Sequence, residues 1–98
     1  MDKQTLLHNV LLLRQAAEKI DEPEKTFKLD DVSQLKIAIE SMAISDIAQK
    51  MQQIDTPGKQ VIDDSIQLAL QANLSQSQRL DAFNKAYGVI KAVMKLAV

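Results

Sequence analysis

The sequence predicts an all-α fold, an antiparallel helical bundle of four helices, or of five if the second helix breaks near Ser45. Only two glycines and two prolines occur in 98 residues, which leaves little turn chemistry for β-hairpins. The chain is 46% hydrophobic but only 3% aromatic, and its apolar residues recur three and four positions apart, as on one face of a helix. A chain of this length fits a single domain, residues 1–98, whose core needs neither a disulfide nor a metal.

The first predicted helix covers residues 2–20 and has a regular apolar face. Its members are Leu6, Val10, Leu13, Ala17 and Ile20. Leu7 and Leu11 widen this face on one side. Pro23 bars continuation of the helix, so the charged segment 21–29 is expected to be a solvated loop, with Phe27 and Leu29 anchoring it to the core.

The second predicted helix begins at Asp30 or Asp31, where the spacing in residues 31–34 fits a capping box. The apolar residues of segment 32–43 share one face, but those of segment 44–54 fall on a face rotated by roughly 150°. One straight helix cannot bury both faces against one core. We therefore predict a break near Ser45, with Ser45 or Asp46 capping a new helix. The alternative is an unbroken helix that packs on two sides.

Two further helix starts are visible in the sequence. Thr56 followed by Pro57 is typical of a cap residue and a first helical position, and predicts a helix from Pro57 to about Asn73. Ser75 with Gln78 three positions later predicts a capping box that opens the last helix, which should run to within a few residues of the C-terminus.

The last helix carries two adjacent apolar stripes that together span roughly 200°, whereas a surface helix needs about 100°. The first stripe, expected in the core, is Leu80, Phe83, Tyr87, Ile90, Met94 and Ala97. The second is Ala82, Ala86, Val89, Val93 and Leu96. Either this helix lies at the centre of the bundle, between the first helix and the Pro57 helix, or the second stripe contacts a partner or a second copy. These five residues are the candidate partner-binding residues. Gly88 predicts a close backbone contact or a slight bend.

The residue types argue against catalysis. The chain has no cysteine, which excludes disulfides, thiolate metal sites and thiol nucleophiles. Its single histidine, His8, is expected to be exposed or partly buried rather than a zinc ligand. The acidic pairs Asp30–Asp31 and Asp63–Asp64 are helix neighbours about 100° apart, so they do not form a paired-carboxylate site. We expect no enzyme activity and no catalytic, cofactor-binding or metal-binding residues.

Two short segments resemble known functional elements. Asp64-Ser65-Ile66 resembles the triplet of small helical carrier proteins, which implies a phosphopantetheine group on Ser65, but Ser65 falls inside a predicted helix instead of at its start. ISDIAQKM followed by TPGKQVI is similar to a helix-turn-helix, yet Asp63 and Asp64 would approach the phosphates of DNA. The net charge of −1 also favours no nucleic-acid partner.

The remaining features predict a small cytoplasmic protein that acts through protein–protein contacts, as an adaptor, a chaperone, an inhibitor or an immunity-type binder, or as a homodimer. Its size and helix count are compatible with immunity proteins for small bacteriocins. One alternative is a peripheral membrane protein that uses Lys85, Lys91 and Lys95 as the polar face of the last helix, although tryptophan is lacking. The other is a carrier modified on Ser65. No apolar run approaches the ~18 residues needed to span a bilayer.

Overall fold

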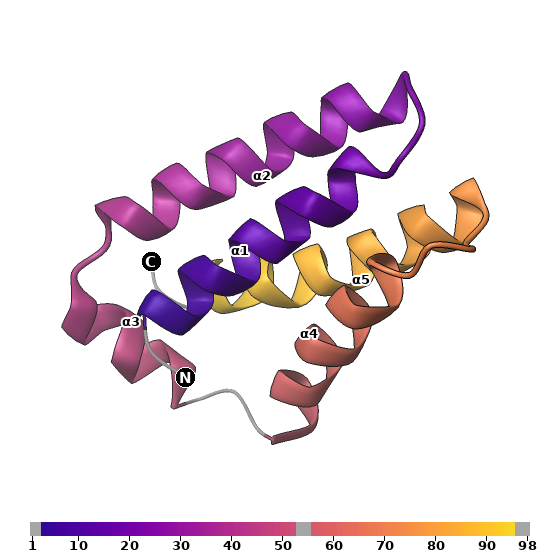
Figure 1. Cartoon of the computed structure of the whole chain (residues 1–98). Helices are drawn as coiled ribbons and strands as arrows, with labels where there is room; N and C mark the ends of the chain where they lie inside the picture. Colours follow the sequence, from indigo (N-terminus) through magenta and orange to yellow (C-terminus); the bar gives the residue numbers. More distant parts are fainter. Residues whose placement is uncertain (1–2, 53–55, 96–98) are drawn as a thin grey trace.

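The computed structural model of the chain covers residues 3–52 and 56–95, except the side chains of residues 51, 56–58 and 93–95. Within these ranges the fold is all-helical, as predicted, and the five-helix form of the bundle is the one observed (Figure 1). The helices are α1 (Lys3–Glu18), α2 (Glu24–Ser41), α3 (Ile44–Met51), α4 (Thr56–Ala69) and α5 (Gln76–Lys95).

The helices surround a core that α1 and α5 share. α1 lies beside α2 on one side and against α4 and α5 on the other, while the short α3 closes one end against α1 and α5 (Figure 1). α5 contacts each of the other four helices. Its predicted central position, flanked by the first helix and the Pro57 helix, is therefore confirmed.

The predicted apolar face of α1 supplies much of the core. All five predicted members of that face are at most 2% exposed, and they pack with Val32 and Ile39 of α2, Ile62 and Ile66 of α4, and Phe83 of α5. A second, smaller contact joins Ala16, Ala69 and Ala82, where small side chains let α1, α4 and α5 approach one another closely. Full burial of each large aliphatic side chain contributes roughly 1.5–3 kcal/mol to folding.

The start of α2 differs from the prediction. The helix begins at Glu24, so most of the segment expected to be a loop is helical. Proline is tolerated at a helix start, and the Glu22 carboxylate accepts hydrogen bonds from the backbone N–H of Thr26 (2.7 Å) and from its hydroxyl (2.7–2.8 Å). Leu29 packs against the core as predicted. Phe27 is 66% exposed and is not an anchor.

The predicted break of the second helix is present, at Met42 and Ala43, and the unbroken alternative is wrong. Both residues are extended, with ψ of 145° and 144°. No side-chain cap forms at Ala43, which precedes α3, so the expected capping by Ser45 or Asp46 is wrong. Instead, the Lys3 ammonium donates hydrogen bonds to the carbonyl oxygens of Glu40 (3.1 Å) and Met42 (2.7 Å). These bonds satisfy carbonyl oxygens that have no intrahelical partner at the end of α2.

The turn between α4 and α5 is held by side chains. α4 ends at Ala69, earlier than predicted, and the Arg79 guanidinium donates to the carbonyl oxygens of Gln71 (3.2 Å) and Ala72 (2.9 Å). The predicted capping box at the start of α5 is confirmed: the Ser75 N–H donates to Oε1 of Gln78 (3.0 Å), and the Gln78 N–H donates to Oγ of Ser75 (3.2 Å).

Candidate functional site

The predicted partner-binding stripe of α5 is largely core, which corrects the prediction for two of its residues. Ala82 is 4% exposed and Ala86 is fully buried, so neither offers surface to a partner. Val89 is half-buried and packs against the core. The side chain of Val93, and Leu96 as a whole, lie outside the described residues. The apolar arc of roughly 200° is wide because α5 is packed on two sides within its own chain.

The first stripe of α5 is core as predicted over its described side chains. Phe83 and Ile90 are fully buried, and Tyr87 stacks on Phe83 with ring centroids 5.8 Å apart. The Lys91 ammonium lies 5.7 Å from the Tyr87 ring centroid. Burial, with a smaller contribution from the nearby Asp31 carboxylate, raises the pKa of Tyr87. This part of α5 therefore turns its apolar surface toward the core.

His8 and Ser65 lie on different helices, α1 and α4. His8 is exposed, whereas Ser65 is 6% exposed in the interior of α4 and lines a hollow between α4 and α5. Residues 3–52 and 56–95 contain no cluster of three or more potential metal-ligating side chains and no helix long and apolar enough to cross a membrane. Gly88 makes no close contact, since a Cβ placed there would have nothing within 4 Å.

A hollow lies between the outer sides of α1 and α2 and is lined by four aliphatic and four polar side chains. It has a volume of about 220 Å³. Its lining residues are Leu7, Val10, Leu11 and Arg14 of α1 and Val32, Ser33, Lys36 and Glu40 of α2. Leu11 is 51% exposed there. The surface arises because the core-facing stripe of α1 points toward α5, while Leu7 and Leu11 project from the adjacent side of the helix.

This surface continues past Leu7 to the start of α3. A second hollow of about 370 Å³ is lined by Lys3, Gln4, Leu7 and Ile44, and Ile44 is 69% exposed. Both hollows include Leu7, and their α1 residues follow one side of that helix at spacings of three and four. We therefore describe the two hollows together as the α1–α2 groove, which is defined by the lining residues of both. Its exposed apolar side chains, Leu11 and Ile44, lie toward opposite ends.

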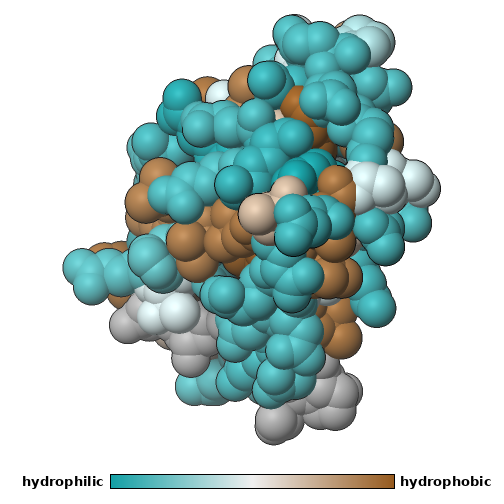
Figure 2. All heavy atoms as spheres, turned by 45° about the vertical axis from the view of Figure 1, so that its right-hand side comes forward, coloured by the Kyte–Doolittle hydropathy of each residue, from teal (hydrophilic) through white to brown (hydrophobic). Residues whose placement is uncertain are grey.

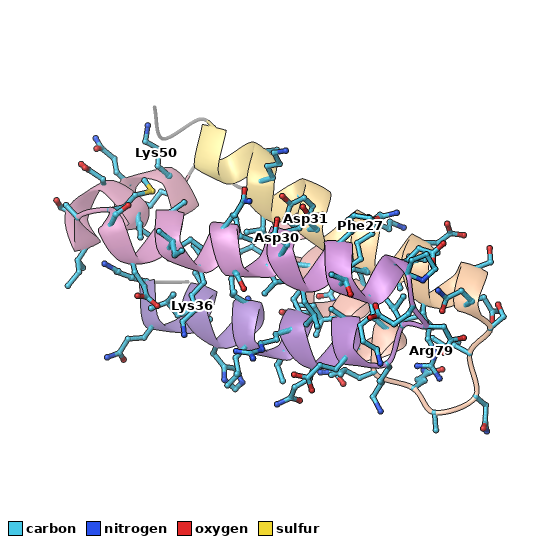
Figure 3. All side chains as sticks on the ribbon, turned by 90° about the horizontal axis from the view of Figure 1, so that it is seen from above. Phe27, Asp30, Asp31, Lys36, Lys50 and Arg79 are labelled. Carbon is cyan, nitrogen blue, oxygen red and sulfur yellow. The ribbon has the colours of Figure 1, made fainter. Side chains whose placement is uncertain are left out.

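The charged side chains along the α1–α2 groove are mostly cationic. Lys3, Arg14 and Lys36 line it with one carboxylate, Glu40. Lys36 lies on the side of α2 that faces α1, whereas Asp31 lies on the opposite side, toward α5 (Figure 3). Arg14 Nε is 3.5 Å from a Glu18 carboxylate oxygen, and Lys36 Nζ is 3.7 Å from a Glu40 oxygen. Both pairs are exposed, and such pairs contribute only about 0–1 kcal/mol.

A different hollow lies between α4 and α5. It has a volume of about 330 Å³ and combines Leu68 and Ala82 with Asp64, Ser65, Gln78, Asp81 and Lys85. Leu68 is 44% exposed. Figure 2 shows that apolar atoms on one face of the molecule gather between hydrophilic side chains instead of being scattered evenly. The α4–α5 hollow has fewer apolar side chains than the α1–α2 groove and brings two carboxylates beside them, so it is the weaker candidate for apolar contact.

Comparisons of the chain with protein-family models, with curated proteins and with solved structures found no match. The surface itself must therefore carry any functional argument. One feature of the sequence indicates the α1–α2 groove. Leu7 and Leu11 widen the apolar face of α1 beyond the stripe of residues that is buried in the core. The contribution of Lys36 and Ile44 depends on how α2 and α3 pack on α1, which their spacing along the chain does not reveal.

Proposed function

We propose that this protein is a non-catalytic protein-binding module and that the α1–α2 groove is its binding surface. The observation that carries the proposal is Leu11, a leucine half exposed to water beside half-buried Leu7 in a concave, largely apolar strip. Single exposed apolar residues are common on protein surfaces, but concave apolar sites with a few charged groups are typical of binding sites.

A partner that covers this surface would gain from apolar burial. Removal of apolar area from water contributes about 25 cal/mol per Å², and the central, well-covered side chains of an interface usually dominate its affinity. Leu11 lies among apolar neighbours with charged residues around it, as the central side chains of interfaces commonly do. The proposal includes the roles of an adaptor, a chaperone, an inhibitor and an immunity-type binder, and the identity of the partner distinguishes these roles.

The experiment is capture of partners from an extract of the source cells by the tagged protein. Leu11→Gln should lower recovery of a specific partner at least about tenfold, which corresponds to 1.4 kcal/mol. Leu68→Gln is the matched control, since it makes the same change at a leucine of similar exposure on a different helix. Circular dichroism of both variants checks that the fold is intact. Equal recovery by Leu11→Gln and the unchanged protein would show that the α1–α2 groove is not the binding surface.

A further inference from the structure

We infer that the occupant of the α1–α2 groove is an amphipathic helix of another protein, with acidic residues beside its apolar anchors. The inference rests on the proposed function and specifies the chemistry of the partner. It is carried by the shape of the groove, by the absence of a strand from the described residues and by the charges of the residues that line the groove.

The shape of the groove fits a helix. The groove follows α1 from Lys3 to Arg14, a length of roughly 17 Å at 1.5 Å per residue. Leu7 and Leu11 lie along it one helical turn apart, and Ile44 lines the same hollow as Leu7 at the α3 end. A helix that docks in a groove presents apolar anchors at i, i+4 and i+7, and its successive anchors are one turn apart, as Leu7 and Leu11 are.

An extended peptide would fit less well. Its backbone N–H and C=O groups need partners, which such peptides usually obtain from the edge of a β-sheet. Residues 3–52 and 56–95 contain no strand, and in the interior of α1 and α2 the backbone groups are bonded inside each helix. A helical occupant bonds its own backbone internally and needs only side-chain contacts.

The charges favour an acidic occupant. Three cations and one carboxylate line the α1–α2 groove, a net charge of +2 (3 − 1), or +1 when the Glu18 carboxylate 3.5 Å from Arg14 is included, on a chain whose overall charge is −1. Lys3 is already bonded to backbone carbonyls, but Arg14 and Lys36 interact only weakly with exposed carboxylates of their own helices. A carboxylate of an occupant could pair with either cation, and the arginine fork binds carboxylates with two parallel hydrogen bonds.

The same charges disfavour a second copy as the occupant. In a two-fold symmetric dimer the same patch meets itself, so each groove would face a surface with the same net positive charge. Like charges that face each other across an interface oppose binding. An acidic helix from a different protein avoids this repulsion.

The test uses three synthetic helical peptides of about four turns. The first carries leucines at i, i+4 and i+7 with glutamates on the flanking positions. The second replaces those glutamates by lysines, and the third keeps the composition of the first with the leucines moved off one face. Binding is measured by fluorescence anisotropy at physiological salt. We expect the glutamate peptide to bind at least tenfold more tightly than the lysine peptide, and the rearranged peptide to show no saturable binding.

Variants of the protein locate the site. Leu11→Gln should lower the affinity for the glutamate peptide at least tenfold, whereas Leu68→Gln should leave that affinity unchanged. The double variant Arg14→Glu/Lys36→Glu should bind the lysine peptide more tightly than the glutamate peptide. Equal binding of both peptides, lost in Leu11→Gln, would overturn the acidic preference but leave the proposed function standing. Failure of every peptide would overturn the inference, while the capture experiment judges the proposed function separately. A dimer of the pure protein in sedimentation equilibrium, abolished by Leu11→Gln, would assign the groove to a second copy and also overturn the inference.

Discussion

Gly88 is an exposed residue in the interior of α5 with open space where a Cβ would lie. Glycine in a helix interior costs about 0.5–1 kcal/mol relative to alanine, because it loses more backbone freedom on folding. Gly88→Ala should therefore raise the free energy of unfolding by about that amount. For a domain of this size the melting temperature should rise by several degrees, at about 4–8 °C per kcal/mol.

Thermal unfolding followed by circular dichroism measures this change. Lys85→Ala, at another exposed position of α5, is a suitable control for a surface substitution that introduces alanine without removing a glycine. A lower melting temperature for Gly88→Ala would mean that the position is crowded, contrary to the open space described.

The residues of α5 and α1 illustrate why a core residue is hard to tell from an interface residue in the sequence. Ala86 and Leu11 both lie beside the main apolar stripe of their helices, so their spacing supports the same two interpretations. Ala86 is fully buried because α5 has neighbours on both sides, whereas Leu11 is half exposed because no described helix covers the outer side of α1 and α2 there. The difference depends on the neighbours, which one helical wheel does not contain.

The start of α2 depends on a hydrogen-bonded carboxylate. The hydrogen bonds from Thr26 lower the pKa of Glu22 below 4.5, because they favour its charged form. A lowered pKa in the folded state stabilises the fold above the unfolded pKa, and this stabilisation is lost as the pH falls through the folded value. Glu22→Gln should therefore reduce stability at pH 7, and its difference from the unchanged protein should shrink as the pH falls below about 4.

Urea unfolding at a series of pH values measures this difference. Thr26→Val removes the hydroxyl donor and should reproduce part of the same pH dependence. The double variant Glu22→Gln/Thr26→Val should be little less stable than Glu22→Gln alone. A stability difference that stays constant from pH 7 to pH 3 would show that the Glu22 charge does not support the start of α2.

Helix boundaries were predicted well only where side chains mark them. The Ser75–Gln78 box was visible in the sequence and forms as expected. The break at Met42 and Ala43 was predicted from the change of apolar face, but its position was missed because no side chain caps α3 there. The early start of α2 was missed because a proline was interpreted as a barrier, although it is tolerated where a helix begins.

The arrangement of the whole molecule was predictable in part. The helical period of the apolar residues and the scarcity of glycine and proline are enough to predict the all-α bundle. The wide apolar arc of α5 is enough to predict its central position. The α1–α2 groove was not predicted, because it arises from residues of three helices that are brought together only in the folded chain. Local patterns report which face of a helix is apolar, while the surface left uncovered depends on the packing of all five helices.

The five helices do not contribute equally to the bundle. α1 and α5 each contact four other helices, whereas α3 has eight residues and packs against α1 and α5. A helix this short is unstable in isolation and depends on its packing, chiefly through Ile47, which is 1% exposed. We therefore predict that α3 opens locally at a lower free energy than the bundle as a whole.

Native-state hydrogen exchange of the unchanged protein and of the Leu13→Ala variant tests this prediction. Leu13 is fully buried in the shared core, so its truncation should lower the free energy of global unfolding by about 2–5 kcal/mol. The amides of α1 and α5 should lose protection by that amount, because they exchange through global unfolding. The protection of the α3 amides should change little as long as the free energy of their local opening is below that of global unfolding. Leu13 remains packed when α3 alone opens, so its truncation does not affect that local opening. Equal loss of protection in α1, α3 and α5 would instead show that the molecule opens as one cooperative unit.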